Sequence, residues 1–376
     1  MALCAALTTA SSLKGERQNF QHSEIEQNLQ IVGPGTTPSR VDMSEALHAL
    51  HIPSASIALI DNGALAWARA WGGASTETLY QAASLSKVVT AVAAMRLVET
   101  GELALDRDVN DDLIGWRVPD NSFTEGHPVT LRGLLSMTAG IGVPGYLGYE
   151  VGAPLPSLTD ILDGRPPANS PPVRVISVPG TQYAYSGGSY EIVQALIQSK
   201  TGQQYDDALQ KLVLRPATMD DSLFGQPLPI SLWGRAARGH YNDGRELPGG
   251  WRIMPELAAG GLWSTPTDLA KLLIEISRAY RGLVSVMHTG TAIEMFTAQN
   301  NGPYGLGGAV RGFGRSLVMM KRGQNIGFQA YMLIFPETGQ GLVLMTGSDN
   351  GSTLANAVIR RAAVIYNWPP LGDLAD

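Results

Sequence analysis

The sequence contains little of several features that define common protein classes. A single cysteine, Cys4, among 376 residues excludes an internal disulfide and a metal site built from several cysteines. No apolar run reaches the roughly 18 residues that a membrane-spanning helix needs. The formal net charge of −6 provides no basic excess for binding nucleic acid. These absences give no support for a disulfide-stapled, membrane-spanning or nucleic-acid-binding protein.

Signatures of metals and nucleotides are also scarce. The sequence has 6 histidines, and only His48 and His51 have a spacing that resembles a ligand pair. They lie at the end of a predicted helix, where we interpret the spacing as incidental. Neither standard glycine-rich phosphate-binding motif is present. The sequence therefore predicts no metal site and no cofactor, while its length and its 44% hydrophobic content are typical of a large buried core.

The most informative stretch is Ser84-Leu85-Ser86-Lys87, which opens a helix-like apolar run over residues 88–98. A serine three residues before a lysine at a helix start places both side chains on one face, one turn apart. The amine can then take the hydroxyl proton, so that the serine becomes an acylating nucleophile without a histidine. Alone the pattern is weak, because Ser11 and Lys14 have the same spacing and a capping serine would explain it.

Two further motifs follow in a meaningful order. Tyr185 lies in a loop of small residues after a Pro-Gly turn, just before the helical run 190–199. Lys321-Arg322-Gly323 ends the strand-like run 315–320 and precedes two long apolar segments. The three motifs together indicate one site that is assembled from distant parts of the chain.

Serine-x-x-lysine, then tyrosine-serine-x, then lysine-x-glycine resembles the motif set of the penicillin-binding-protein and class C β-lactamase superfamily. That superfamily also contains the family VIII carboxylesterases and D-amino-acid peptidases. The resemblance covers residues 41–368, which is most of the chain. It implies a serine hydrolase that forms an acyl-enzyme with a small ester, amide or lactam and needs no cofactor.

The resemblance also implies a role for each site residue. Ser84 attacks the carbonyl carbon, Lys87 is its base, and Tyr185 passes the proton to the leaving group. Burial and the neighbouring cation Lys321 are expected to lower the pKa of Lys87. The backbone N–H groups of Ser84 and Gln324 are expected to form the oxyanion hole. The residues expected to border the substrate are Gly187, Lys321, Arg322 and Gly323.

Lys321 and Arg322 together are expected to form a cationic rim for a substrate carboxylate. Gly187 departs from the family pattern, which commonly has an asparagine there to hold the substrate amide. This departure favours hydrolysis of small carboxylic esters, with D-amino-acid amides next. The alternatives are β-lactamase or DD-peptidase activity, acyl transfer, and a non-catalytic protein that binds penicillin or a peptide. Ser348-Asp349-Asn350 spells a class A β-lactamase motif but follows Lys321, so we interpret it as a turn in which Asn350 or Ser352 caps the last helix.

The pattern of elements predicts an α+β fold, an α/β sandwich with a central antiparallel sheet flanked by helices and a mainly helical inserted subdomain. Residues 39–100 and 301–376 are expected to form the sheet subdomain and residues 101–300 the helical one, with the active site at their junction. The expected strands are 56–60, 64–71, 304–310, 316–320, 330–335 and 342–346, and the expected outer helices are 42–51 and 354–368.

Residues 1–38 are predicted to be a leader or linker. Residues 2–13 are small and apolar, like the middle of a signal peptide, but no basic residue precedes them. Residues 14–38 are polar. Either a signal peptide has been trimmed or this is a cytosolic form, and we favour an exported or periplasmic location. The oligomeric state is left open.

Overall fold

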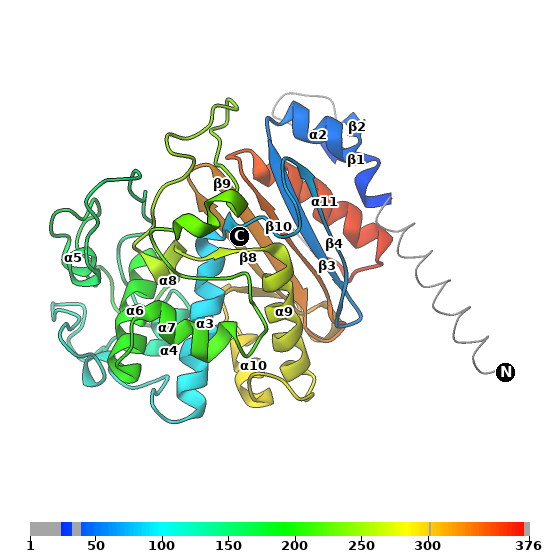
Figure 1. Cartoon of the computed structure of the whole chain (residues 1–376). Coiled ribbons are helices and arrows are strands. Elements are labelled where there is room, and N and C mark those ends of the chain that lie inside the picture. Colours follow the sequence, from blue (N-terminus) through cyan, green and yellow to red (C-terminus); the bar gives the residue numbers. More distant parts are fainter. Residues whose placement is uncertain (1–23, 32–38, 301, 372–376) are drawn as a thin grey trace.

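A central sheet organises the molecule (Figure 1). The computed structural model describes residues 24–31, 39–300 and 302–371. Six antiparallel strands follow the order β4-β3-β10-β9-β8-β7, so that segments from both ends of the chain are neighbours. This arrangement confirms the predicted α+β fold class. The strands are β3 Ser54–Asp61, β4 Ala64–Gly72, β7 Ala309–Arg311, β8 Val318–Asn325, β9 Phe328–Phe335 and β10 Gln340–Thr346.

The alternation of side chains along the strands explains why the sheet is covered on both faces. Along β3, Ile57 and Leu59 belong to one core, while Ala58 and Ile60 belong to the other. Successive residues of a strand point to opposite faces, so a strand that is apolar throughout must be buried on both. Helices α2 and α11 cover the first face, and α9 with the remaining helices covers the second (Figure 1).

Most helices lie on the second face of the sheet. The helices are α2 Met43–Ala49, α3 Ser86–Glu99, α4 Leu131–Leu135, α5 Leu158–Asp163, α6 Gly187–Thr201, α7 Tyr205–Leu209, α8 Leu257–Gly260, α9 Pro266–Tyr280, α10 Thr289–Met295 and α11 Gly351–Ile365. Helix α9 contacts β3, β4, β9 and β10, although it lies within the part predicted to be the helical subdomain. The predicted subdomain boundaries stay predictions.

Short elements complete the described chain. They are the strands β1 Leu29–Ile31, β2 Ser39–Val41, β5 Tyr80–Gln81 and β6 Trp263–Ser264, the 3-10 helices η1 Ala83–Leu85, η2 Val109–Asp111, η4 Ile230–Arg235 and η5 Gly314–Ser316, and the π-helical turn η3 Gln210–Leu214. Three of these matter for the site. The turn η1 leads into α3, and β5, which pairs with β6, lies directly before η1 in the chain.

Two expected element boundaries are wrong. The strand expected over 304–310 is reduced to β7, because the chain turns at a run of glycines. A side chain at Gly305 would lie 2.0 Å from the carbonyl of Met295, and Gly307 has a φ of +111° against α3. Strand β8 extends further than expected, so Lys321 lies inside the strand rather than after it.

The turn before α11 also differs from the expectation. Asn350 occupies the N-cap position, but its side chain makes no capping bond. It donates instead to the carbonyls of Leu50 and Asn242, at 2.8 Å each. The Ser348-Asp349-Asn350 stretch therefore joins α11 to two other segments of the chain, and tertiary contacts have replaced the local cap.

Part of the predicted leader is folded. Ile25 and Leu29 are completely buried against the face of the sheet that carries α11, and Arg361 of α11 pairs with Glu24 at 2.6 Å. Strand β1 pairs with β2. The other residues of the predicted leader, 1–23 and 32–38, lie outside the described residues. Among the helices that the structure describes, none is long and apolar enough to cross a membrane.

Candidate active site

A strained turn presents Ser84 at the entrance to α3. Ala83, directly before it, has a φ of +48°, in the left-handed region that alanine rarely adopts. The turn is held on one side by the Ala82 N–H, which donates to the carbonyl of Leu262 at 2.8 Å. On the other side Gly323 of β8 approaches so closely that a Cβ there would lie 2.9 Å from the Ser84 nitrogen. Such strain, held from both sides, is typical of a functional position.

Lys87 lies one turn further along and points back at Ser84. Its Nζ donates to Ser84 Oγ at 3.1 Å and to the carbonyl oxygen of Ala259 in α8 at 2.6 Å. The residue is only 2% exposed. Burial lowers the pKa of Lys87, and the nearby Lys321 lowers it further, while Tyr185 and Glu191 oppose the shift. A lysine in this environment is suited to lose its proton and act as a base.

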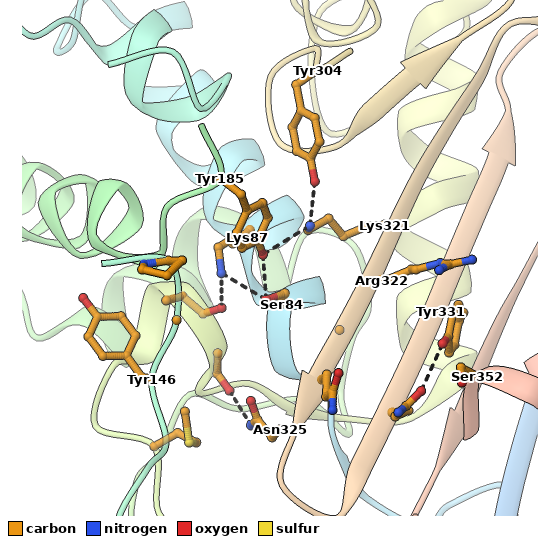
Figure 2. A pocket seen from close by; sticks show the side chains of 18 of the residues that line it. Ser84, Lys87, Tyr146, Tyr185, Tyr304, Lys321, Arg322, Asn325, Tyr331 and Ser352 are labelled. Carbon is orange, nitrogen blue, oxygen red and sulfur yellow. Dashed lines mark hydrogen bonds between the residues drawn. The ribbon is translucent and has the colours of Figure 1, made fainter. Parts of the chain in front are cut away.

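Tyr185 lies across from Ser84, directly before α6. Its hydroxyl donates to Ser84 Oγ at 2.9 Å and accepts from Lys321 Nζ at 3.3 Å (Figure 2). Lys321 also donates to the hydroxyl of Tyr304 at 2.8 Å. The structure therefore brings together the serine, the two lysines and the tyrosine that the three sequence motifs supply, and it adds a second tyrosine.

The electrostatics of Tyr185 result from opposing effects. Burial alone would raise its pKa, because a phenolate is poorly solvated inside a protein. The positive charges of Lys87 and Lys321, together with the hydrogen bonds that Tyr185 shares with Ser84 and Lys321, outweigh burial and lower the pKa of Tyr185 to about 7. The tyrosine can therefore exchange a proton near neutral pH.

The loop before α6 is pinned by Met137. The Ala184 N–H donates to the Met137 carbonyl at 2.8 Å, and the Ser186 N–H lies 3.3 Å from the Met137 sulfur. Ser186 then caps α6 by accepting from the Ser189 N–H. Tyr185 is thus held on both sides by its chain neighbours, which fixes its hydroxyl relative to Ser84.

A cavity of about 530 Å³ opens beside Ser84. Its lining contains every residue that the sequence analysis assigned to catalysis or substrate binding except Gly187. Gln324 lies on the same cavity as Ser84, as an oxyanion hole built from their N–H groups requires. Among the described residues no group of three or more histidine, cysteine, aspartate or glutamate side chains could hold a metal ion.

The two expected rim cations lie on opposite faces of β8. Lys321 points to Tyr185, whereas Arg322 points away from Ser84, over the ring of Tyr331 and toward Asn356 of α11 (Figure 2). The alternation of side chains along a strand imposes this division. The predicted pairing of the two cations therefore has to be revised, with Lys321 beside the serine and Arg322 at the far end of the cavity.

Gly187 does not line the cavity itself, but it lies against Tyr146, which does. A Cβ at this position would lie 3.0 Å from a ring carbon of Tyr146, which does line the cavity. The aromatic ring therefore occupies the space where the family's asparagine would begin. Sequence reasoning missed Tyr146, and no local motif marks it.

Other lining residues could not be found from the motifs either. Tyr304 follows a turn, and Ala259 contributes only a backbone oxygen. Asn325 is different, because it follows Lys321 and Gly323 at a spacing of two along β8. Strand periodicity alone places it on the same face as these residues.

The comparisons with known proteins agree with this geometry. The family model described as Beta-lactamase matches residues 41–366. The chain belongs to the Beta-lactamase family, whose members are serine hydrolases. This confirms the predicted superfamily, and the match ends close to the predicted limits.

The sequence is similar to two curated relatives over different parts of its length. Penicillin-binding protein 4 of Amycolatopsis lactamdurans is 34% identical over 182 residues, which are 46% of this chain and 45% of that protein. Protein flp of Staphylococcus aureus strain MW2 is 25% identical over 322 residues, which are 78% of this chain and 59% of that protein. The chain thus spans less than two thirds of the length of both relatives.

Solved structures show the same fold over nearly the whole chain. The octameric penicillin-binding protein homologue from Pyrococcus abyssi has a TM-score of 0.72 and 25% identity, and the match covers 88% of this chain and 77% of that one. The D-amino acid amidase from Ochrobactrum anthropi SV3 has a TM-score of 0.70 and 22% identity, covering 92% and 98%.

Proposed function

We propose that this protein hydrolyses small carboxylic esters through an acyl-enzyme on Ser84. The observation that supports this most directly is the hydrogen-bonded cluster around the Ser84 hydroxyl, which lies 3.1 Å from Lys87 Nζ and 2.9 Å from the Tyr185 hydroxyl. A serine with two proton-exchanging groups in reach is activated for attack on a carbonyl carbon.

In the proposed acylation, Ser84 Oγ bonds to the carbonyl carbon while its proton passes to neutral Lys87. The negative charge on the former carbonyl oxygen is stabilised by the backbone N–H groups of Ser84 and Gln324. The bond to the leaving alcohol breaks as Tyr185 gives it a proton. Acylation therefore leaves Tyr185 ionised and Lys87 protonated, with the positive charge of Lys87 close to the phenolate.

In the proposed deacylation, the ionised Tyr185 takes a proton from a water molecule as the water attacks the acyl carbonyl. A pKa of about 7 for Tyr185 suits this role, because a useful fraction of the phenol is ionised at neutral pH. Tyr185 passes this proton to Ser84 Oγ as the ester bond breaks and the acid leaves. The proton held by Lys87 then returns to Tyr185, which restores the state in which acylation began. Lys321 Nζ donates to the Tyr185 oxygen and holds it in place.

Esters are the proposed substrates because of what occupies the place of the missing asparagine. An alkoxide leaves more readily than an amine, so an ester needs less help from a side chain that holds its carbonyl group. Tyr146 fills the space beside Gly187 with carbon atoms rather than with an amide. D-amino-acid amides come second, since an amidase is among the proteins with this fold.

Labelling with a fluorophosphonate probe tests the nucleophile. One adduct is expected, on Ser84, and Ser84→Ala should remove it, whereas an adduct on Ser86 or Ser186 would contradict the assignment. A non-catalytic binder would not be labelled at all. Turnover of p-nitrophenyl acetate and butyrate, of D-amino-acid anilides and of a chromogenic cephalosporin then ranks the substrates, with the esters expected first.

The second base is tested with a matched pair of tyrosines. Tyr185→Phe should lower ester turnover by about two or more powers of ten, since it removes one member of a cooperative group. Tyr183 lies two residues earlier in the chain and lines the same cavity, where the centroid of its ring is 5.2 Å from that of Tyr304. Tyr183→Phe removes only its hydroxyl and is the matched control. If Tyr183→Phe proved the more damaging change, the second motif would be misaligned by two residues.

A further inference from the structure

A second cavity, of about 730 Å³, lies among α5, α6, α7 and α8 (Figure 1). Helix α8 contributes to the walls of both cavities, because Leu257 lines the second cavity, while Ala259 and Gly260 line the catalytic one. Among the described residues, none lines both. The volume is within the usual range for a small-molecule site, and the proposed hydrolysis makes no use of this cavity.

The two cavities carry opposite charges. Among the described residues that line the second cavity, Asp206 is the one carboxylate, and none is a lysine, arginine or histidine. The catalytic cavity is lined by Lys87, Lys321 and Arg322, with no aspartate or glutamate among its described residues. A ligand with a positive charge is therefore favoured in the second cavity and disfavoured beside Ser84.

The Asp206 carboxylate is fixed through one oxygen and open at the other. Its Oδ1 accepts from the Phe224 N–H at 2.8 Å. Among the residues that the structure describes, none donates a hydrogen bond to Oδ2 or forms an ion pair with it. A Cβ at Gly225, which also lines the cavity, would lie 4.0 Å from Oδ2, and this places the oxygen at the cavity wall.

The surroundings of Asp206 do not compensate its charge. The side chain is half-buried, and burial raises the pKa of its carboxyl, to which the neighbouring Asp207 adds a smaller upward effect. The hydrogen bond from Phe224 opposes the shift, and no cation contributes to it. A partly buried carboxylate without a cation is poorly stabilised, so a bound cation would supply the charge that the protein lacks there.

Polar amides of the cavity wall are already engaged within the protein. Gln194 accepts from the Ala258 N–H at 3.1 Å, and Gln226 donates to the carbonyl of Gly261 at 2.9 Å. Both glutamines line the cavity, but these bonds hold the two ends of α8 and its continuation. Asp206 Oδ2 is therefore the strongest acceptor on the wall that is left for a ligand.

The rest of the wall includes a large apolar part. The Trp116 ring is fixed, because its indole N–H donates to Asp163 Oδ1 at 2.9 Å. Aromatic rings attract cations as well as apolar groups. The cavity thus combines one open carboxylate oxygen with a surface for a hydrocarbon ring or chain. The apolar lining residues are Trp116, Leu158, Leu162, Phe224 and Leu257.

We propose that the second cavity binds a small organic ammonium compound, whose N–H groups donate to Asp206 Oδ2 and whose apolar part packs against Trp116 and Leu257. The site is separate from Ser84, and the inference does not depend on the proposed esterase activity. A ligand there would contact α8, the helix whose Ala259 carbonyl accepts from Lys87.

Two probes of nearly the same shape test the proposal. Benzylamine carries an ammonium group at neutral pH where benzyl alcohol carries a hydroxyl. Calorimetric titration of the full chain, without any ester present, measures the dissociation constant of each. Benzylamine is expected to bind about tenfold or more tightly than benzyl alcohol, as a charge-assisted hydrogen bond to a partly buried carboxylate predicts.

The variant Asp206→Asn keeps an acceptor for the Phe224 N–H and removes the charge. The ratio of the two dissociation constants should then fall to about one. Asp207→Asn is the matched control, because Asp207 is the next residue of α7, is exposed and does not line the cavity. It removes the same charge and should preserve the ratio.

The indole N–H resonance of Trp116 locates the ligand in the unaltered protein. Benzylamine should shift this resonance and leave that of Trp233, which lines neither cavity, in place. This measurement stands even where Asp206→Asn does not fold. Equal binding of the two probes, no binding of benzylamine, or a Trp116 resonance that does not move overturns the proposal. A preference for benzylamine that survives in Asp206→Asn also overturns it.

Discussion

At the scale of single residues, Tyr185 connects the charges of the site to its pH dependence. Its pKa of about 7 results from a balance in which two lysines outweigh burial. A phenol whose pKa is lowered gains its ionised form as the pH rises through that value. Deacylation by the ionised tyrosine should therefore increase with pH, with a half-point near 7.

Removal of one of the two lysines should move that half-point. Lys321→Met takes away a positive charge beside the phenol, which destabilises the phenolate and raises the pKa of Tyr185. The half-point of the deacylation rate is expected to move to higher pH, as measured by single-turnover kinetics across pH 5 to 10. Arg322→Met is the control, because Arg322 lies on the other face of β8 and should leave the half-point in place. A shift to lower pH in Lys321→Met would contradict the assigned electrostatics.

The ring of Tyr146 explains why position 187 is a glycine rather than an asparagine, because it fills the space that the larger side chain would need. An asparagine here would press on the Tyr146 ring at 3.0 Å and on the Pro144 carbonyl at 3.4 Å. Gly187→Asn should therefore lower the free energy of unfolding by about 1–3 kcal/mol, the usual cost of overpacking, without producing cephalosporin hydrolysis.

The double variant Gly187→Asn with Tyr146→Ala should recover most of that loss, because the ring that obstructs the asparagine is gone. Denaturant unfolding of the two single variants and the double variant measures the coupling between the positions. Gly145→Ala serves as a control, since a Cβ there meets no atom within 4 Å. Additive effects of the two changes would show that Tyr146 is not the obstacle.

At the scale of elements, α6 holds α8, the short helix whose Ala259 carbonyl accepts from Lys87. Glu191 of α6 accepts from the Ala259 N–H at 3.0 Å, and Gln194 accepts from the Ala258 N–H at 3.1 Å. The carbonyl oxygen of the same residue, Ala259, accepts from Lys87 Nζ. Burial and the nearby Glu256 raise the pKa of Glu191 well above its ordinary value.

We expect Glu191 to act on Lys87 by holding Ala259 in place, because its carboxyl accepts from the Ala259 N–H. Glu191→Gln keeps the acceptor and should retain the acylation rate, while Glu191→Leu should lower it by about tenfold or more by releasing Ala259. Gln194→Leu removes the bond to Ala258, whose carbonyl accepts from Thr90 and not from Lys87, and should have a smaller effect. Pre-steady-state bursts measure these rates. A loss in Glu191→Gln equal to that in Glu191→Leu would instead assign the effect to charge.

The elements also show which parts of the site sequence reasoning could reach. Strong apolar runs predicted β9 and β10 to within two residues, and helix periodicity predicted α11 to within three, because these patterns report burial directly. The grouping of Ser84, Lys87 and Tyr185 came from family resemblance, which carries long-range information that local patterns lack. Ala259 could not be predicted, since a backbone carbonyl leaves no mark in a sequence.

At the scale of the whole molecule, the sheet separates the chemistry from a second core. Ser84 lies on the face covered by α3, α6 and α8, whereas α2 and α11 pack with the N-terminal segment on the other face (Figure 1). The far end of the cavity reaches Tyr331 of the second core and Ser352 of α11. Among the described residues the two cores are separate clusters, and alternate side chains of the strands belong to one or the other. We therefore expect that substitutions in the outer core away from the cavity change stability more than activity.

The N-terminal segment offers a test of this separation. Ile25 and Leu29 are completely buried in the outer core, and Glu24 pairs with Arg361. A chain that begins at residue 39 should unfold with about 3 kcal/mol or more less free energy than one that begins at residue 24, because two buried aliphatic side chains are lost. Its kcat/KM for p-nitrophenyl esters should match that of the longer chain at temperatures where both are folded. A large loss of activity without a loss of stability would show that the outer core supports the site through the sheet, rather than being insulated from it.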